Sequence, residues 1–342
     1  MFKRQKGSIV AVLVVFTILF AVTLSACSIL NQATPKPALP GQATPSPPLH
    51  LSPPPDGQGL YESCAPVHGQ SCLDRLKQMA AGGFQLVVNY DQLSGSAAQE
   101  LAYAHQAQAL GMKIIWGMSN PNLWNGKARS TYPDLTATCN CSDDTGFIKY
   151  VVNLVKNLPA TWGYYIGDEE SNQHAQVKAL SEVVYSTDPH HPRLYVSCGQ
   201  CSGEQGGKYV AGLTPMVDTA EVLGPDWYPV GSGGDTVADT ARVAAATQAL
   251  AEKSGKQSTV VLQAFSWASY NSHNCDPWPS CAPWPTVDQM RQMKDLALQN
   301  SHPRLLLWYS FFDILRSDHP AAHWADLVAA AGAKLGNKRT AG

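Results

Sequence analysis

The central part of the sequence alternates short apolar runs with longer amphipathic stretches, and this alternation restricts the fold more than any other feature. Eight runs have the length and residue types of buried strands, at residues 59–63, 84–89, 113–116, 162–167, 193–196, 220–224, 259–264 and 304–310. Stretches with helical spacing lie between and after them, at residues 72–81, 97–110, 144–157, 175–186, 207–215, 238–254, 287–300 and 321–335. Such alternation favours βαβ units and a parallel sheet. Eight units in about 280 residues predict a (β/α)8 barrel, that is, a TIM barrel of the α/β class.

A doubly wound open sheet is the alternative topology, because the helix expected at residues 207–215 is weak. Nucleotide-binding sheets of that kind place a glycine-rich phosphate loop after a strand. The glycine cluster at residues 231–234 follows the sixth expected strand, but it lacks both the Gly-x-Gly-x-x-Gly spacing and a lysine. We interpret it as a flexible loop and favour the barrel.

The first residues have the features of a secretory signal. Three basic residues precede an apolar run at residues 9–24, and small residues stand directly before Cys27. The sequence Leu24 to Cys27 resembles the bacterial lipobox, in which the cysteine receives diacylglycerol and begins the mature chain. The resemblance predicts a signal peptide at residues 1–26, lipidation of Cys27 and a lipoprotein on the outer face of a bacterial cell membrane. An uncleaved N-terminal anchor is the alternative.

A proline-rich segment follows the lipobox. Nine prolines occur between residues 28 and 56, and such a composition favours extended, unfolded chain. We therefore predict a linker at residues 27–56 and one barrel domain at residues 57–342. Removing the three basic residues of the signal leaves 21 Lys and Arg against 26 Asp and Glu, which gives no indication of nucleic-acid binding.

The cysteines other than Cys27 fall into close pairs, which in an exported protein indicates disulfides. The pairs are Cys64 and Cys72, Cys139 and Cys141, Cys198 and Cys201, and Cys275 and Cys281. Spacing does not fix the connectivity, and because a Cys-x-Cys ring is small, bonds from Cys139 and Cys141 across to Cys198 and Cys201 are an alternative. Zinc is a less favoured interpretation of these four cysteines, because no histidine pair lies nearby.

Carboxylates cluster where two of the expected strands end. Asp168, Glu169 and Glu170 follow the fourth strand, and Asp226 follows the sixth. In a (β/α)8 barrel the chemistry takes place at the C-terminal ends of the strands. We therefore expect these four acids on the catalytic rim.

Aromatic residues gather at the same strand ends. Flat aromatic faces stack on sugar rings, and polar side chains bind the hydroxyls around them, so the rim suggests a carbohydrate as substrate. About half of the rim tryptophans are expected to serve packing instead. The candidate substrate-binding residues are Trp116, Trp227, Tyr228, Gln263 and Trp267.

The segments Tyr164–Glu169, Asp226–Pro229, Gln263–Trp267 and Pro285–Gln289 together resemble TIM-barrel glycoside hydrolases. In the retaining glycosidases of clan A, the acid/base is a glutamate that follows an asparagine at the end of strand four, and the nucleophile is a glutamate that ends strand seven. Glu169 matches the first position, with Asp168 in place of the asparagine. Gln263 stands at the second position, and an amide cannot act as a nucleophile in double displacement.

Two interpretations follow from this mismatch. In the first, Asp226 supplies the second carboxylate, and its separation from Glu169 decides between retention, at about 5 Å, and inversion, at about 6.5–9.5 Å. In the second, the barrel has lost hydrolysis and the chain is a carbohydrate-binding surface lipoprotein. Binding of an oligosaccharide or polysaccharide is expected in both.

Roles for the three adjacent acids follow from crowding. Carboxylates packed together beside an apolar strand retain protons more readily, which suits a proton donor, and we predict Glu169 as the general acid. Asp168 is expected to orient it or to bind hydroxyls. Glu170 is expected in the first turn of the next helix, where negative charge is favoured. The sequence shows neither a paired-histidine metal motif nor a Gly-x-Ser-x-Gly elbow, so no metal and no cofactor are expected.

Overall fold

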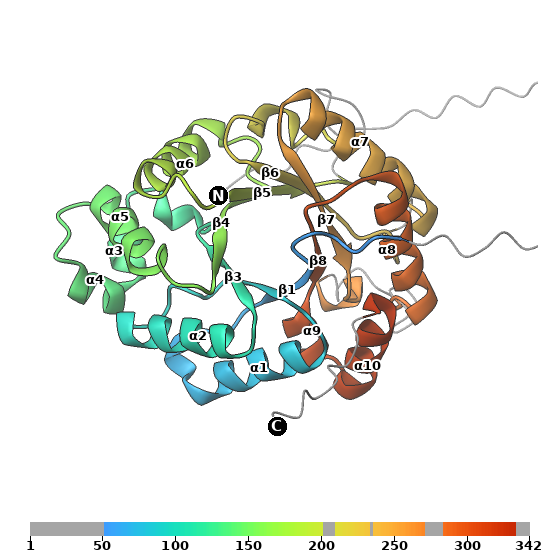
Figure 1. The fold of residues 1–342 in the computed structure, drawn as a ribbon, viewed down its shortest axis with the longest axis horizontal. Helices are drawn as coiled ribbons and strands as arrows, with labels where there is room; N and C mark the ends of the chain where they lie inside the picture. The colour runs from blue at the N-terminus through green and yellow to red at the C-terminus, as the bar shows by residue number, and fades with distance from the viewer. Residues whose placement is uncertain (1–50, 201–208, 233–234, 271–282, 333–342) are drawn as a thin grey trace, which may run out of the picture. The chain divides into compact units, whose positions relative to one another are not determined.

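The computed structural model describes residues 51–200, 209–232, 235–270 and 283–332. Eight parallel strands pair in chain order, and the last pairs with the first, which closes a barrel (Figure 1). The strands are β1 (Gln58–Glu62), β2 (Leu86–Asn89), β3 (Lys113–Gly117), β4 (Thr161–Asp168), β5 (Arg193–Cys198), β6 (Val222–Trp227), β7 (Gln257–Gln263) and β8 (Leu305–Tyr309). The predicted (β/α)8 fold is confirmed.

Helices surround the barrel (Figure 1). They are α1 (Gln70–Ala81), α2 (Ala97–Ala109), α3 (Ala128–Thr131), α4 (Pro133–Cys139), α5 (Asp144–Val155), α6 (His174–Thr187), α7 (Thr240–Lys253), α8 (Val287–Asn300), α9 (Phe311–Arg316) and α10 (Pro320–Ala331). Side chains fix several helix starts: the Ser96 and Thr286 hydroxyls each accept from the backbone N–H three residues later in a capping box, at α2 and α8.

All eight expected strands are present within a few residues of their predicted limits. The expected helix at residues 207–215 is wrong over its described part, where turns lead into a 3-10 turn at Thr214–Met216. Gly212 and Pro215 in this short stretch disfavour a regular helix. The helices α3, α4 and α9 were not predicted, because each is too short to show a clear periodicity.

Alternate residues of each strand point to opposite sides of the barrel wall and form two apolar layers. On β2, Leu86 and Val88 pack inside the barrel, whereas Val87 packs outside with the helices. On β3, Ile115 packs inside and Ile114 outside. This alternation decides which side chains at the strand ends face the barrel axis.

Two disulfides join cysteines that the sequence had placed in pairs. Cys64 is bonded to Cys72, with Cα atoms 5.7 Å apart, and Cys139 is bonded to Cys141. The alternative bonds from Cys139 and Cys141 across to the later pair are therefore wrong. Cys198 is also disulfide-bonded. The remaining predicted pair, Cys275 and Cys281, lies outside the described residues, as does Cys201.

Residues 1–50, which include the predicted signal, Cys27 and most of the predicted linker, lie outside the described residues as well. In the parts of the chain that the structure describes, no helix combines the length and the apolar character needed to cross a membrane.

Helix α2 contains a buried carboxyl in its first turn. Glu100 is 1% exposed, and its two oxygens accept hydrogen bonds from Gln92 Nε2 at 2.7 Å and from the Gly95 backbone N–H at 3.2 Å. These bonds favour the ionised form, but burial outweighs them and raises the pKa of Glu100 to about 8. The folded protein therefore holds a proton here that the unfolded chain loses at lower pH.

Glu100 makes the free energy of unfolding fall as the pH rises. Its contribution to the free energy of unfolding is fully present below the usual pKa of 4.5 and is lost as the pH rises through about 8. Between these values the free energy of unfolding falls by up to about 1.4 kcal/mol per pH unit. Glu100→Gln should reduce the slope over this range, as measured by chemical denaturation at a series of pH values. The exposed Glu182→Gln serves as the control and should keep the parent slope. Equal slopes in the parent and Glu100→Gln would contradict this account.

Candidate active site

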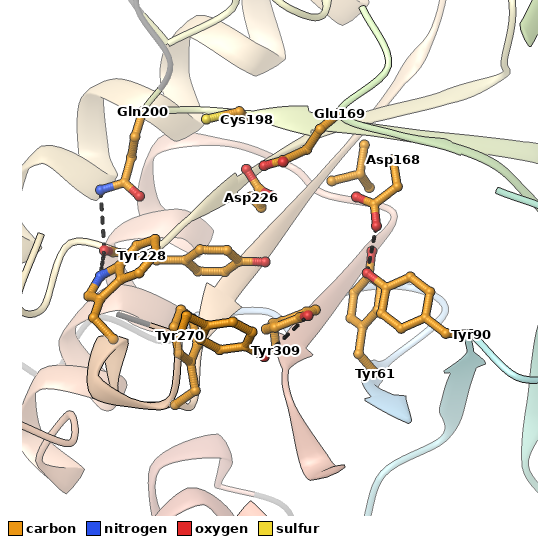
Figure 2. Close-up of a pocket in the computed structure, with 13 residues that line it drawn as sticks. Tyr61, Tyr90, Asp168, Glu169, Cys198, Gln200, Asp226, Tyr228, Tyr270 and Tyr309 are labelled. Carbon is orange, nitrogen blue, oxygen red and sulfur yellow. Dashed lines mark hydrogen bonds between the residues drawn. The ribbon is translucent and has the colours of Figure 1, made fainter. Parts of the chain in front are cut away.

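A cavity of about 220 Å3 opens at the C-terminal ends of the strands. Three carboxylates line it, from Asp168, Glu169 and Asp226. Aromatic residues form much of the remaining lining: Tyr61, Tyr90, Tyr228, Phe265, Trp267, Tyr270 and Tyr309. Figure 2 shows Glu169 and Asp226 pointing toward one another, with Tyr228, Tyr270 and Tyr309 beneath them in this view.

Glu169 and Asp226 form a close carboxylate pair. Their nearest carboxylate oxygens lie within 4.8 Å of one another, and Cys198 Sγ lies within the same limit of both. Because Cys198 is disulfide-bonded, its sulfur is not a thiolate and does not serve as a metal ligand. Glu169 is exposed at the opening of the cavity, whereas Asp226 is only 6% exposed.

Burial and the neighbouring charge act together on Asp226. Desolvation raises the pKa of Asp226 well above its usual range, and the charge of Glu169 raises it further. The Gly199 backbone N–H, 3.2 Å from Asp226 Oδ1, opposes this shift only in part. The buried Asp226 is therefore the member of the pair that retains a proton more readily.

Asp168 lies on the other side of Glu169. Burial raises the pKa of Asp168 to about 6, although the Tyr90 hydroxyl donates to Asp168 Oδ2 at 2.7 Å and favours its ionised form. Burial, together with the negative charge of Asp168, keeps the pKa of Tyr61 and Tyr90 well above the usual range, so both rings remain neutral phenols.

The aromatic residues contact one another around the cavity. The ring centroid of Tyr309 lies 5.3 Å from that of Tyr61 and 5.5 Å from that of Tyr228. Trp267 Nε1 donates to the Tyr228 backbone carbonyl at 3.1 Å, and Phe265 packs edge-on against Trp267, with ring centroids 5.2 Å apart. These contacts hold the aromatic lining in a fixed arrangement.

The backbone of Glu169 has a left-handed conformation, with φ of 62°. Its N–H donates to the Val196 carbonyl at 3.0 Å, and the Glu170 carboxylate turns back to accept from the Asp168 N–H. Burial raises the pKa of Glu170 to about 7. The prediction that Glu170 lies in the first turn of the next helix is wrong, because α6 begins only at His174 and Glu170 instead supports the turn.

The predicted site residues divide into two groups. The cavity is lined by Asp168, Glu169, Asp226, Tyr228 and Trp267. The other three, Trp116, Trp227 and Gln263, are fully buried and do not line it.

Strand alternation explains where the two tryptophans lie. Trp116 follows the inward Ile115 and points outward, where its Nε1 donates to Thr161 Oγ1 at 2.9 Å. Trp227 follows Asp226 and also points outward, with its Nε1 3.1 Å from Thr240 Oγ1.

Gln263 bonds to backbone instead of facing the cavity. Its Oε1 accepts from the Val230 N–H at 2.8 Å, and its Nε2 donates to the carbonyls of Val230 at 2.9 Å and Phe265 at 3.1 Å. The amide at the end of β7 therefore fastens the loop that follows β6.

Several residues of the cavity were not among the predicted site residues: Tyr61, Tyr90, Cys198, Gln200, Phe265, Tyr270 and Tyr309. Strand alternation in the sequence could have identified two of them, Tyr309 and Tyr90. Leu305 and Leu307 point inward on β8, and counting two residues further gives Tyr309. The same count from Leu86 and Val88 gives Tyr90. For loop residues such as Gln200 and Tyr270, strand alternation supplies no such rule.

The strain at Glu169 is measurable. A residue with a Cβ costs about 1–2 kcal/mol in the left-handed region, whereas glycine does not, although glycine loses about 0.5–1 kcal/mol through unfolded-state entropy. We expect Glu169→Gly to be more stable than Glu169→Ala by about 0.5–1 kcal/mol in chemical denaturation. Both variants lack the carboxylate, so their difference isolates the backbone. A less stable glycine variant would contradict the left-handed assignment.

Comparisons with known proteins agree with this architecture. No protein-family model and no curated protein sequence matches the chain. Among solved structures, a Bacteroides thetaiotaomicron VPI-5482 protein assigned as an α-L-fucosidase is similar, with a TM-score of 0.54 and 13% identity, over 86% of this chain and 99% of that one.

Two further solved structures are similar. A GH5_18 protein from Bifidobacterium longum subsp. infantis has a TM-score of 0.51 and 13% identity, over 81% of this chain and 78% of its own. A β-galactosidase from Marinomonas ef1 has a TM-score of 0.55 and 9% identity over 80% of this chain, which spans only 59% of that protein. At these identities the likeness shows the fold: the chain has the TIM barrel found in glycoside hydrolases, as the sequence resemblance predicted.

Proposed function

We propose that the protein is a glycoside hydrolase that uses Glu169 and Asp226 as its two catalytic carboxylates. The observation that carries the proposal is the approach of these carboxylates to within 4.8 Å, in a cavity lined by aromatic rings at the C-terminal ends of the barrel strands. Glycosidases place two carboxyl groups on either side of the scissile bond, and aromatic faces hold the sugar rings.

The difference in burial between the two carboxyl groups supports a different role for each. Asp226 is the buried member, and its raised pKa favours the protonated form, so it is the proton donor in the proposed mechanism. Glu169, exposed at the opening of the cavity, is the partner that acts as the nucleophile. This reverses the roles expected from the clan A resemblance, in which Glu169 is the acid.

We propose that the anomeric configuration is retained, because the nearest oxygens of the two carboxyl groups lie within 4.8 Å, below the roughly 6.5–9.5 Å that separates the carboxyl groups of inverting enzymes. In the first step Asp226 protonates the glycosidic oxygen as its bond to the anomeric carbon breaks, and a Glu169 oxygen bonds to that carbon. In the second step the Asp226 carboxylate takes a proton from water, the water oxygen bonds to the anomeric carbon, and the ester to Glu169 breaks. Asp168 lies beside the nucleophile, where it can bind a sugar hydroxyl.

The two roles predict different responses to the leaving group. Asp226→Asn removes the proton donor, so turnover of natural glycosides should fall by about 10²–10⁴, while aryl glycosides with acidic phenol leaving groups should be far less affected. Glu169→Gln removes the nucleophile and should abolish turnover of both the natural and the aryl glycosides. The measurement is product release by each variant on a panel of oligosaccharides and matched nitrophenyl glycosides.

Glu182 is exposed, so Glu182→Gln is the control for the loss of one carboxylate and should retain the activity of the parent. If Asp226→Asn and Glu169→Gln respond in the opposite way to leaving-group acidity, the roles are exchanged. If the parent hydrolyses nothing on the panel but calorimetry detects bound sugar, the glycosidase proposal fails, and the alternative of a carbohydrate-binding barrel without turnover replaces it.

We also propose that the chain is exported and tethered to the outer face of a bacterial membrane through lipid on Cys27. The apolar run at residues 9–24, the lipobox resemblance and the proline-rich segment after it support this proposal. A tether of this kind would hold the barrel near polysaccharides at the cell surface.

Lipidation is expected to depend on the Cys27 thiol alone. When the full chain is expressed in a bacterium fed an alkyne-labelled fatty acid, it should be labelled and found in the membrane fraction, and Cys27→Ala should lose the label. The adjacent Ser28→Ala should keep it. Labelling of Cys27→Ala at the parent level would exclude the proposed lipid site.

A further inference from the structure

The described lining of the cavity carries negative charge and no positive charge. The lining contains three carboxylic acids, Asp168, Glu169 and Asp226. Its other ionisable residues are tyrosines, because Cys198 is disulfide-bonded, and no Lys, Arg or His is among the lining residues that the structure describes. Asp226 retains a proton more readily than a solvated carboxyl group, but no basic side chain of the described lining compensates the other two acids.

Three acids elsewhere in the described chain have basic partners. Asp188 contacts His191 Nδ1 at 2.7 Å, and Asp218 contacts Lys178 Nζ at 3.0 Å. Glu221 forms an ion pair with Arg193. The carboxylates of the cavity differ, because their neighbours are other acids, backbone N–H groups and phenols. A ligand with a positive charge would give them the partner that these other acids already have.

The aromatic lining suits the same kind of ligand. Ring faces attract cations within about 6 Å, and the attraction is stronger where water is excluded. Tyr90, Tyr228 and Tyr309 surround the space beside the carboxylates, and Tyr90 also hydrogen-bonds to Asp168 (Figure 2). Carboxylates on one side and neutral phenol rings on the other form a cage that fits an ammonium group.

A buried hydroxyl provides a further observation. Tyr61 is 1% exposed and lines the cavity, and its hydroxyl interacts with the buried Tyr165 hydroxyl without forming a hydrogen bond of standard geometry. A buried hydroxyl that is only weakly hydrogen-bonded costs free energy, which a ligand can recover by bonding to it. The phenol oxygen can accept an N–H from an ammonium group held beside Asp168.

We propose that the sugar bound in this cavity carries a free amino group, so that the substrate is an oligosaccharide or polysaccharide of amino sugars in their ammonium form. The inference rests on the proposed function for its sugar class. The carboxylates themselves favour the charged form of the amine. Asp168, supported by Tyr90, is the specificity-determining residue in this proposal.

Binding to matched probes tests the charge preference. The full chain in neutral detergent is titrated by calorimetry with tetramers of glucosamine and of galactosamine, with their N-acetylated counterparts and with oligogalacturonate. We expect at least one amino tetramer to bind about tenfold or more tightly than its acetylated form, and the difference to shrink as salt is added. Asp168→Asn should reduce the preference by about tenfold, because it removes one charge and little volume.

Asp313→Asn is the matched control. Asp313 is buried and accepts from the Tyr270 hydroxyl at 2.7 Å, but it does not line the cavity, so this variant should keep the parent preference. The inference is overturned if no amino tetramer binds, if acetylated or acidic probes bind equally well, or if Asp168→Asn keeps the full preference.

Hydrolysis is scored separately, so that the two proposals can fail independently. Preference for the amino tetramers without turnover supports the substrate class and counts against the glycosidase mechanism. Turnover of neutral or acidic sugars without that preference supports the mechanism and overturns the substrate class.

Discussion

The closeness of Glu169 and Asp226 is the constraint on which the whole site depends. Two carboxylates within 4.8 Å repel one another, and Asp226 is also removed from water, so the arrangement is unfavourable unless a proton is shared. The closed sheet makes it possible, because the backbone of β6 fixes Asp226 and the hydrogen bond from Glu169 N–H to Val196 ties the turn after β4 to β5. The stability of the barrel therefore supports a local arrangement that opposes folding.

Strand alternation determines how much of this site the sequence could predict. The eight apolar runs were sufficient to predict the barrel, and its geometry then brought the acids after the fourth and sixth strands to one rim. The direction of each side chain required the alternation within each strand as well. Trp116 and Trp227 were chosen for their position at strand ends, yet each follows an inward residue and so belongs to the layer beneath the helices.

Other parts of the site depend on contacts that sequence spacing does not encode. The φ of 62° at Glu169 and the return of the Glu170 carboxylate to the Asp168 N–H follow from how β4 meets β5. The register between these strands shifts near Tyr165 to Gly167, so counting along β4 alone does not give the direction of Asp168. Gln200 and Tyr270 come from loops, where no periodicity exists.

The three hydrogen bonds of Gln263 have an evolutionary consequence. Two of them run from its amide nitrogen to the carbonyl oxygens of Val230 and Phe265. A glutamate at this position would place a carboxylate oxygen against both carbonyls, so the loop after β6 would have to move before strand seven could supply a nucleophile. Exchange between this arrangement and one with a nucleophile on strand seven therefore requires coordinated changes in two loops. A change from a barrel with acids on strands four and six to one with a glutamate on strand seven would therefore pass through a protein in which the loop after β6 is no longer held by residue 263.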